Sequence, residues 1–189
     1  MSEFTPYDRV ARILHWTIAI LIIALLTIGF LMGNIPDEQL SRKIFVYNMH
    51  KSFGLTVLVL SLFRLLWRLT HKAPSLPSSM KKWEIGISHL THFLFYAFMI
   101  VMPLVGWALV STSKFPSKLF NLVNLPYIPF LANSPDKKAL HEVFEETHEL
   151  LAFLAIALIV LHVVAALKHH YKDKDDVLAR MMPRLHKDV

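Results

Sequence analysis

The stretch "RILHWTIAILIIALLTIGFL", residues 12–31, decides the fold because it is long and apolar enough to cross a lipid bilayer. A hydrocarbon core of about 30 Å needs roughly 20 apolar residues in a helix. This run supplies them and also carries one histidine, His15, near its start. An ionisable side chain inside a membrane span is costly, so His15 indicates a function and needs a partner elsewhere in the chain.

Three more apolar runs follow the first, separated by connectors rich in Pro, Ser and charged residues. The sequence therefore predicts one all-α domain over residues 1–189, folded as a four-helix transmembrane bundle. We expect the spans at about residues 10–32, 44–69, 85–110 and 143–167. The first run is too long for the apolar part of a signal peptide, and no A-x-A-like cleavage site follows it, so we expect it to be retained.

The net charge of +6 reflects orientation in the membrane, because the basic residues flank the apolar runs rather than forming a patch for nucleic acid. Thirteen Lys and Arg residues lie on the side that holds both termini, and seven lie on the other side. By the positive-inside rule, both termini are predicted to be cytoplasmic. Membrane lipid is the expected surrounding, and nucleic acid is not an expected partner.

The chain has no cysteine and 11 histidines. The lack of cysteine excludes disulfides, thiolate metal sites and covalently attached c-type haem. Histidine is therefore the metal ligand that remains in quantity. Six histidines lie in or just inside the predicted spans: His15, His50, His89, His92, His148 and His162.

The predicted topology sorts four of these histidines into two pairs by depth. His15 and His162 lie near the inner side of the membrane, and His50 and His148 lie near the outer side. The fourteen residues from His148 to His162 span close to four helical turns, about 21 Å, and keep both side chains on nearly the same face. The spacing predicts two stacked sites, each built from two helices.

Haem iron suits such pairs, because a porphyrin leaves two axial positions for the protein, whereas zinc usually takes a third protein ligand. The residue one turn after each paired histidine is small, which lets a flat ring approach the helix. Those residues are Ala19, Gly54, Ala152 and Ala166. His89 and His92 are followed at that spacing by Phe93 and Tyr96, so we interpret them as packing or supporting residues. Hydrogen bonding of the histidines across helices remains the alternative reading.

The order and spacing of five motifs resemble the bacterial cytochrome b561 family, in its short single-subunit branch. The motifs are "ILHWT", "NMHKSFG", "SHLTHFLFYAFMIVMPLVGW", "THELLAFLAIALIVLHVVAALKHHY" and "RMMP". The resemblance implies two noncovalent b-type haems with bis-histidine ligation: His15 with His162 at the inner haem, and His50 with His148 at the outer haem. It also implies residence in the bacterial inner membrane.

Proteins closest to this pattern are superoxide oxidases, so the resemblance implies transfer of electrons from superoxide to ubiquinone. One alternative is a haem-bearing membrane anchor of a hydrogenase or dehydrogenase complex, although nothing in the sequence requires an obligate protein partner. A second alternative is a histidine-lined metal transporter, which would be colourless.

Basic residues near the predicted sites have two readings each. Arg64 and Arg68 are either interfacial anchors or a clamp on a propionate of the inner haem, and Lys51 is a candidate for the same role at the outer haem. His169 and His170, in "LKHHYKDK", are either a solvated basic flank or a quinone site that donates a hydrogen bond and a proton. The apolar outer connector "KLFNLVNLPYIPFLAN" is expected to cap the outer haem at the interface.

Overall fold

The computed structural model describes residues 4–77, 80–114 and 117–182. Four helices among them are long and apolar enough to cross a membrane. They are α1 (Arg9–Met32), α2 (Leu40–Thr70), α3 (Lys82–Thr112) and α5 (Lys137–Lys168). The predicted all-α bundle is thus confirmed, with α5 beginning six residues before the predicted span. The predicted domain of residues 1–189 extends at both ends past the described residues.

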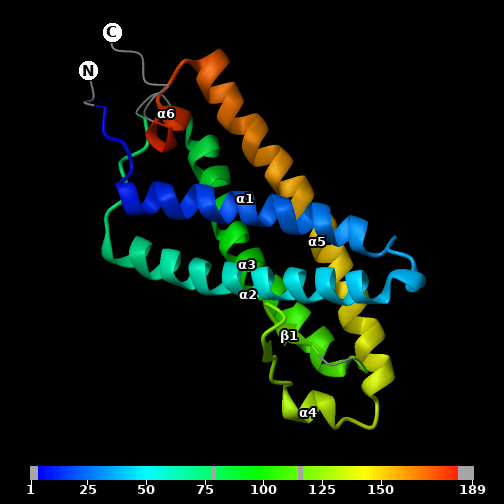
Figure 1. Ribbon diagram of the computed structural model, residues 1–189. Coiled ribbons are helices and arrows are strands. Elements are labelled where there is room, and N and C mark those ends of the chain that lie inside the picture. Colours follow the sequence, from blue (N-terminus) through cyan, green and yellow to red (C-terminus); the bar gives the residue numbers. More distant parts are fainter. Residues whose placement is uncertain (1–3, 78–79, 115–116, 183–189) are drawn as a thin grey trace.

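The bundle consists of two helical hairpins that cross each other (Figure 1). Helix α1 packs on α2, α3 packs on α5, and α2 joins the hairpins by packing on α3. Within the described parts of the chain, α5 makes its close backbone contacts with α3 rather than with α1 or α2. Side chains must therefore bridge the distance from α5 to the first hairpin.

A small apolar core marks the place where the first three helices meet. Ile18, Val57 and Met99 form its buried centre, and Leu25 and Phe95 pack against it. Many other large apolar side chains of the helices are exposed, as expected for helices whose outer faces contact lipid.

Helix α1 begins at a carboxylate cap that also connects it to α2. Asp8 Oδ1 accepts a hydrogen bond from the Ala11 N–H at 2.9 Å. Trp67 Nε1 donates to both carboxylate oxygens of Asp8 at 3.2 Å. Partial burial acts to raise the pKa of Asp8, but these hydrogen bonds to the ionised form outweigh it and hold that pKa below its ordinary value.

The connector between α3 and α5, which the sequence predicts to lie on the outer side, folds into a β-hairpin, β1 (Lys118–Leu119) with β2 (Val123–Asn124), followed by the short helix α4 (Pro129–Ala132). Its two turn residues, Phe120 and Asn121, have φ values of 49° and 61°. They are the central residues of a turn in which the Leu122 N–H donates to the Leu119 carbonyl at 2.9 Å, and three residues separate the paired Leu119 and Val123.

Buried polar side chains of α2 hold this hairpin against the bundle. Asn48 Nδ2 donates to Asn121 Oδ1 at 2.8 Å, and the Phe120 N–H donates to Ser52 Oγ at 2.7 Å. Both α2 residues stand within one turn of His50. The hairpin therefore covers the end of the bundle beside His50, in the region where we expected a cap from the sequence.

The last described segment of the chain packs at the opposite end of the bundle, which the sequence predicts to be the inner end. After α5 comes one π-helical turn, η2 (His169–Asp173), and then the short helix α6 (Val177–Met181). The Tyr7 N–H donates to the Arg180 carbonyl at 3.1 Å, and Trp16 Nε1 donates to the Met181 carbonyl at 3.3 Å. Helix α6 and the N-terminal segment thus lie at the same end of the molecule (Figure 1).

Candidate functional site

The structure places the predicted histidine partners next to each other at two levels of the bundle. The ring centroids of His15 on α1 and His162 on α5 are 6.3 Å apart. Those of His50 on α2 and His148 on α5 are 6.4 Å apart. Each pair bridges helices that do not pack closely together, so the rings span the space between the two hairpins.

These separations fit a metal ion held linearly between two imidazoles. A metal–nitrogen bond of about 2.0 Å and a ring centroid about 1.1 Å behind the nitrogen would place two centroids roughly 6.2 Å apart. In addition, the Nδ1 atoms of His50 and His148 are buried with no hydrogen-bond partner among the described residues. A buried unpaired nitrogen is costly, so these rings are suited to a bound group.

Two glycines make room for the outer pair. A Cβ atom at Gly106 on α3 would lie 3.2 Å from Cε1 of His148, and one at Gly29 on α1 would lie 3.4 Å from Cε1 of His50. Gly54, one turn after His50, has no heavy atom within 4 Å of a Cβ position. Sequence reasoning singled out Gly54 but missed Gly29 and Gly106, because the close approach involves neighbouring helices.

A third histidine joins the inner pair. The ring of His92 on α3 lies 6.0 Å from that of His162, and Phe95 lies 5.1 Å from His162. By ring distance alone, His92 is as close a neighbour of His162 as His15 is. However, α3 packs directly along α5, which leaves less space between His92 and His162 for a wide ring than the α1–α5 gap. His89 is exposed at the inner end of α3.

The inner pair lies near arginines that lack acidic partners. Arg64 and Arg68 line a small cavity of about 30 Å³ together with Asp8, His71 and other residues. Within the described chain, neither arginine forms an ion pair with a carboxylate. Nε of Arg12, one turn before His15, is buried without a partner as well, and sequence reasoning had not singled it out.

Lys51 occupies the comparable position beside the outer pair. Its ammonium donates to Ser117 Oγ at 2.6 Å, and Ser117 is buried under the hairpin. Across the described ranges no carboxylate lies within ion-pair distance of Lys51. Lys51 is therefore a half-buried cation that needs an anion.

The two histidines of the predicted quinone site have different surroundings. His169 is buried, and its Nδ1 lies 2.6 Å from Asp175 Oδ2 and 3.3 Å from Asp173 Oδ2. His170 is half-buried and meets the Tyr171 ring edge-on at 4.8 Å. The structure therefore separates two residues that the sequence treated alike.

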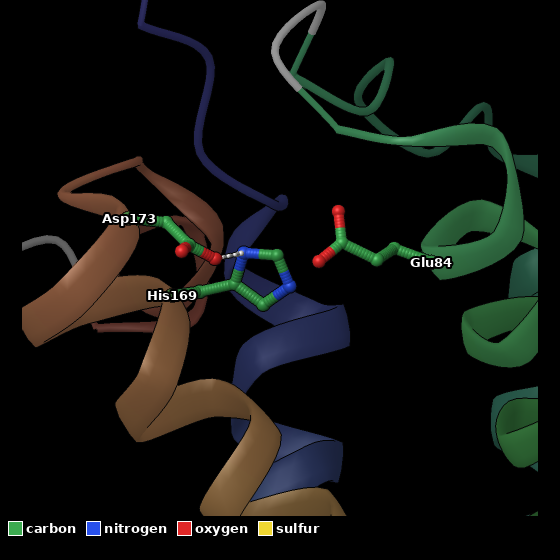
Figure 2. A group of neighbouring side chains, drawn as sticks. All are labelled: Glu84, His169 and Asp173. Carbon is green, nitrogen blue, oxygen red and sulfur yellow. Dashed lines mark ion pairs between the residues drawn. The ribbon is translucent and has the colours of Figure 1, made fainter.

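Ligand atoms of Glu84, His169 and Asp173 lie within 4.8 Å of one another, as they would around a metal ion (Figure 2). The ammonium of Lys168 already lies there, 2.6 Å from Glu84 Oε1 and 2.7 Å from Asp173 Oδ2. Because this lysine neutralises both carboxylates, we interpret the group as a charge network and do not assign it a metal.

Residues 6–184 match the family model described as prokaryotic cytochrome b561. Cytochrome b561 homolog 1 of Escherichia coli is 31% identical over 179 residues, which cover 94% of this chain and 97% of that protein. The probable superoxide oxidase CybB of Yersinia pestis is 30% identical over 171 residues, covering 90% and 92%. Cytochrome b561 homolog 2 of Escherichia coli is 26% identical over 185 residues, covering 96% and 94%.

The contact of Gly106 with His148 gives a first prediction. Gly106→Leu should displace the His148 ring, because overpacking a tight site costs about 1–3 kcal/mol. Of the two haems predicted from the sequence, we expect this variant to lose the one assigned to the outer pair and to keep the one assigned to the inner pair, as measured from its visible absorption per mole of protein. Gly86→Leu is the matched control, since nothing lies within 4 Å of a Cβ atom there. Equal haem content in both variants would contradict the prediction.

Proposed function

The chain belongs to the prokaryotic cytochrome b561 family of membrane electron-transfer proteins, and we propose that it is a dihaem cytochrome that oxidises superoxide and reduces ubiquinone. Family membership implies b-type haem. The proposal of two haems is carried by one observation: two histidine pairs with nearly equal ring separations, 6.3 and 6.4 Å, at two levels of helix α5.

The residues present fit a haem at each level. Haem iron takes four nitrogens from the porphyrin and two axial ligands from the protein. In this proposal His15 and His162 hold the inner haem, and His50 and His148 hold the outer one. Open space at Gly54 and the lack of close α5 packing on α1 and α2 leave room for the macrocycles.

The cations without acidic partners fit the haem propionates. An arginine guanidinium pairs well with carboxylates, and Arg64, Arg68 and Arg12 lie around the inner level. Lys51 lies beside the outer pair, where it would pair with a propionate of the outer haem. Pairing with propionates would compensate the charge of these half-buried side chains.

Iron held by two histidines is six-coordinate, carries one electron at a time and has no open position for oxygen. The protein's part is to fix the histidine rings and to cover each site. The asymmetric Lys and Arg distribution supports an inner-membrane protein with both termini in the cytoplasm. The outer pair would then face the periplasm.

Three observations support the donor and the acceptor. A relative at 30% identity carries the name probable superoxide oxidase, and Lys51 places an uncompensated positive charge beside the outer pair, where a small anion would be attracted. At the inner end, His169 is a buried imidazole held by carboxylates at the end of a membrane-spanning helix, where it would meet a quinone head group in the bilayer.

Haem content tests the first part of the proposal. Two complete histidine pairs should bind two b-type haems per chain. A pyridine haemochrome assay on the purified protein, together with the protein concentration, measures this ratio. A ratio of one would refute the dihaem assignment, and a colourless protein would favour the metal-transporter alternative.

Alanine substitutions test the pairing. His15→Ala and His162→Ala should remove the same haem, because one axial bond of that iron is lost in each. His50→Ala and His148→Ala should remove the other haem. Redox titration of the remaining haem in each variant shows which site survives. His92→Ala is the control, and loss of the inner haem in that variant would make His92, instead of His15 or in addition to it, a ligand.

Stopped-flow kinetics separate entry of electrons from their exit. His169→Ala or His170→Ala should slow reoxidation of the reduced haems by a soluble ubiquinone analogue, and should leave their reduction by superoxide largely intact. The burial of His169 leads us to expect the larger effect there. Unchanged reoxidation in both variants would argue against the inner quinone site, and an outer site near Tyr127 would become the better hypothesis.

A further inference from the structure

Helix α5 marks where the bilayer ends on the side of the hairpin, because α5 begins at the end of the molecule where β1 and α4 lie (Figure 1). Glu149, which is exposed, and Lys168 enclose the residues 150–167, a run without Asp, Glu, Lys or Arg. At about 1.5 Å per residue, this run measures roughly 27 Å, close to the thickness of a hydrocarbon core. The edge of the hydrocarbon therefore falls beside Glu149, next to His148. On α2 it falls beside His50, whose ring lies 6.4 Å from that of His148.

The hairpin lies against α2 at this same level. The Lys118 N–H donates to Asn48 Oδ1 at 3.2 Å, and the Phe120 ring meets the Phe53 ring edge-on at 5.6 Å. Asn48 stands two residues before His50 and Phe53 three residues after it, so both lie within about 5 Å of His50 along the helix axis. The hairpin turn is therefore held at the edge of the hydrocarbon.

The hairpin presents apolar side chains away from the bundle as well as towards it. On the side that packs against the bundle, Ser117 and Leu125 are buried. On the other side, Leu122, Val123 and Phe120 are 81%, 65% and 45% exposed, and Leu122 is the most exposed large apolar side chain that the structure describes. These three residues belong to a connector and not to a span. Neighbouring apolar side chains left exposed in this way mark an interaction surface.

Membrane lipid is the partner that fits this surface. Through Phe53, the hairpin turn adjoins the apolar run of α2, which already faces lipid. Lys118 is exposed, and among the described residues no carboxylate lies within ion-pair distance of it, so its ammonium is available to lipid phosphates. At the base of the connector, Trp107 Nε1 donates to the Pro126 carbonyl at 2.8 Å, and tryptophan is enriched at membrane–water interfaces.

We propose that the hairpin turn inserts Phe120, Leu122 and Val123 into the edge of the leaflet that the sequence predicts to be the outer one. Interfacial segments bury their apolar side chains about 5–10 Å into the boundary between head groups and acyl chains. The hairpin is then held by α2 on one side and by lipid on the other. This lipid contact lies outside the four spans and does not depend on the proposed electron-transfer function.

The reactivity of introduced thiols tests the insertion, and the chain has no cysteine of its own to interfere. Leu122→Cys and Val123→Cys are reconstituted as full-length protein in nanodiscs of phosphatidylethanolamine and phosphatidylglycerol, and are treated with a charged maleimide. A thiol in hydrocarbon is neither ionised nor reached by such a reagent. We expect both variants to react on the order of tenfold more slowly than a thiol in water.

Three control variants calibrate the rates. Glu142→Cys, exposed at the outer part of α5, gives the rate in water, and Val160→Cys, exposed in the middle of the α5 span, gives the rate in lipid. Asn124→Cys is the matched control within the hairpin. It is exposed like Val123 but follows it directly in β2, so its side chain points to the opposite face of the strand. We expect Asn124→Cys to react faster than Val123→Cys.

A photocrosslinker identifies what covers the hairpin turn. Leu122→Cys is coupled to a benzophenone maleimide in detergent, reconstituted and irradiated, and the products are resolved by intact-protein mass spectrometry. We expect adducts with the mass of one phospholipid.

Two results would overturn the proposal. Thiols at Leu122 and Val123 that react as fast as the thiol at Glu142 would place the hairpin turn in water. Slow reaction with crosslinked dimers and without lipid adducts would instead show that a second copy of the chain covers it.

Discussion

The structure depends on the cost of placing an imidazole inside an apolar bundle. Each such ring needs a partner, and in this chain four rings meet their partners across the two hairpins rather than within one. That requirement explains why α5 can stand away from α1 and α2 and still carry both levels of the site. It also explains why glycines, not larger residues, face His50 and His148.

Polar residues outside the histidine pairs hold the two ends of the bundle. At the outer end, Asn48 and Ser52 form hydrogen bonds with backbone and side-chain groups of the hairpin that would otherwise lie buried and unpaired. At the inner end, Arg180 is buried and donates to the Ser75 carbonyl, which connects α6 to the α2–α3 connector. The four spans are thus alike in their apolar composition, whereas the two ends of the bundle are held by different polar groups.

Much of this arrangement could be predicted from the sequence, since apolar length gives the spans and topology gives the depth of each histidine. The beginning of α5 could not, because its first residues are charged and helical beyond the apolar run. The approach of Gly106 to His148, the position of His92 beside His162 and the fold of η2 onto Asp175 also escaped prediction. Each depends on the rotation of one helix about another or on a backbone turn, which no periodic pattern encodes.

The division into two hairpins has a consequence for how the protein is made. Helices α1 and α2 are consecutive in the chain, as are α3 and α5 apart from the short elements between them, so each hairpin can enter the bilayer as a unit during synthesis. Every histidine pair takes one ring from each hairpin. Under the proposed function, neither haem site would be complete until the second hairpin has been inserted, because a chain that ended after α2 would lack one histidine of each pair.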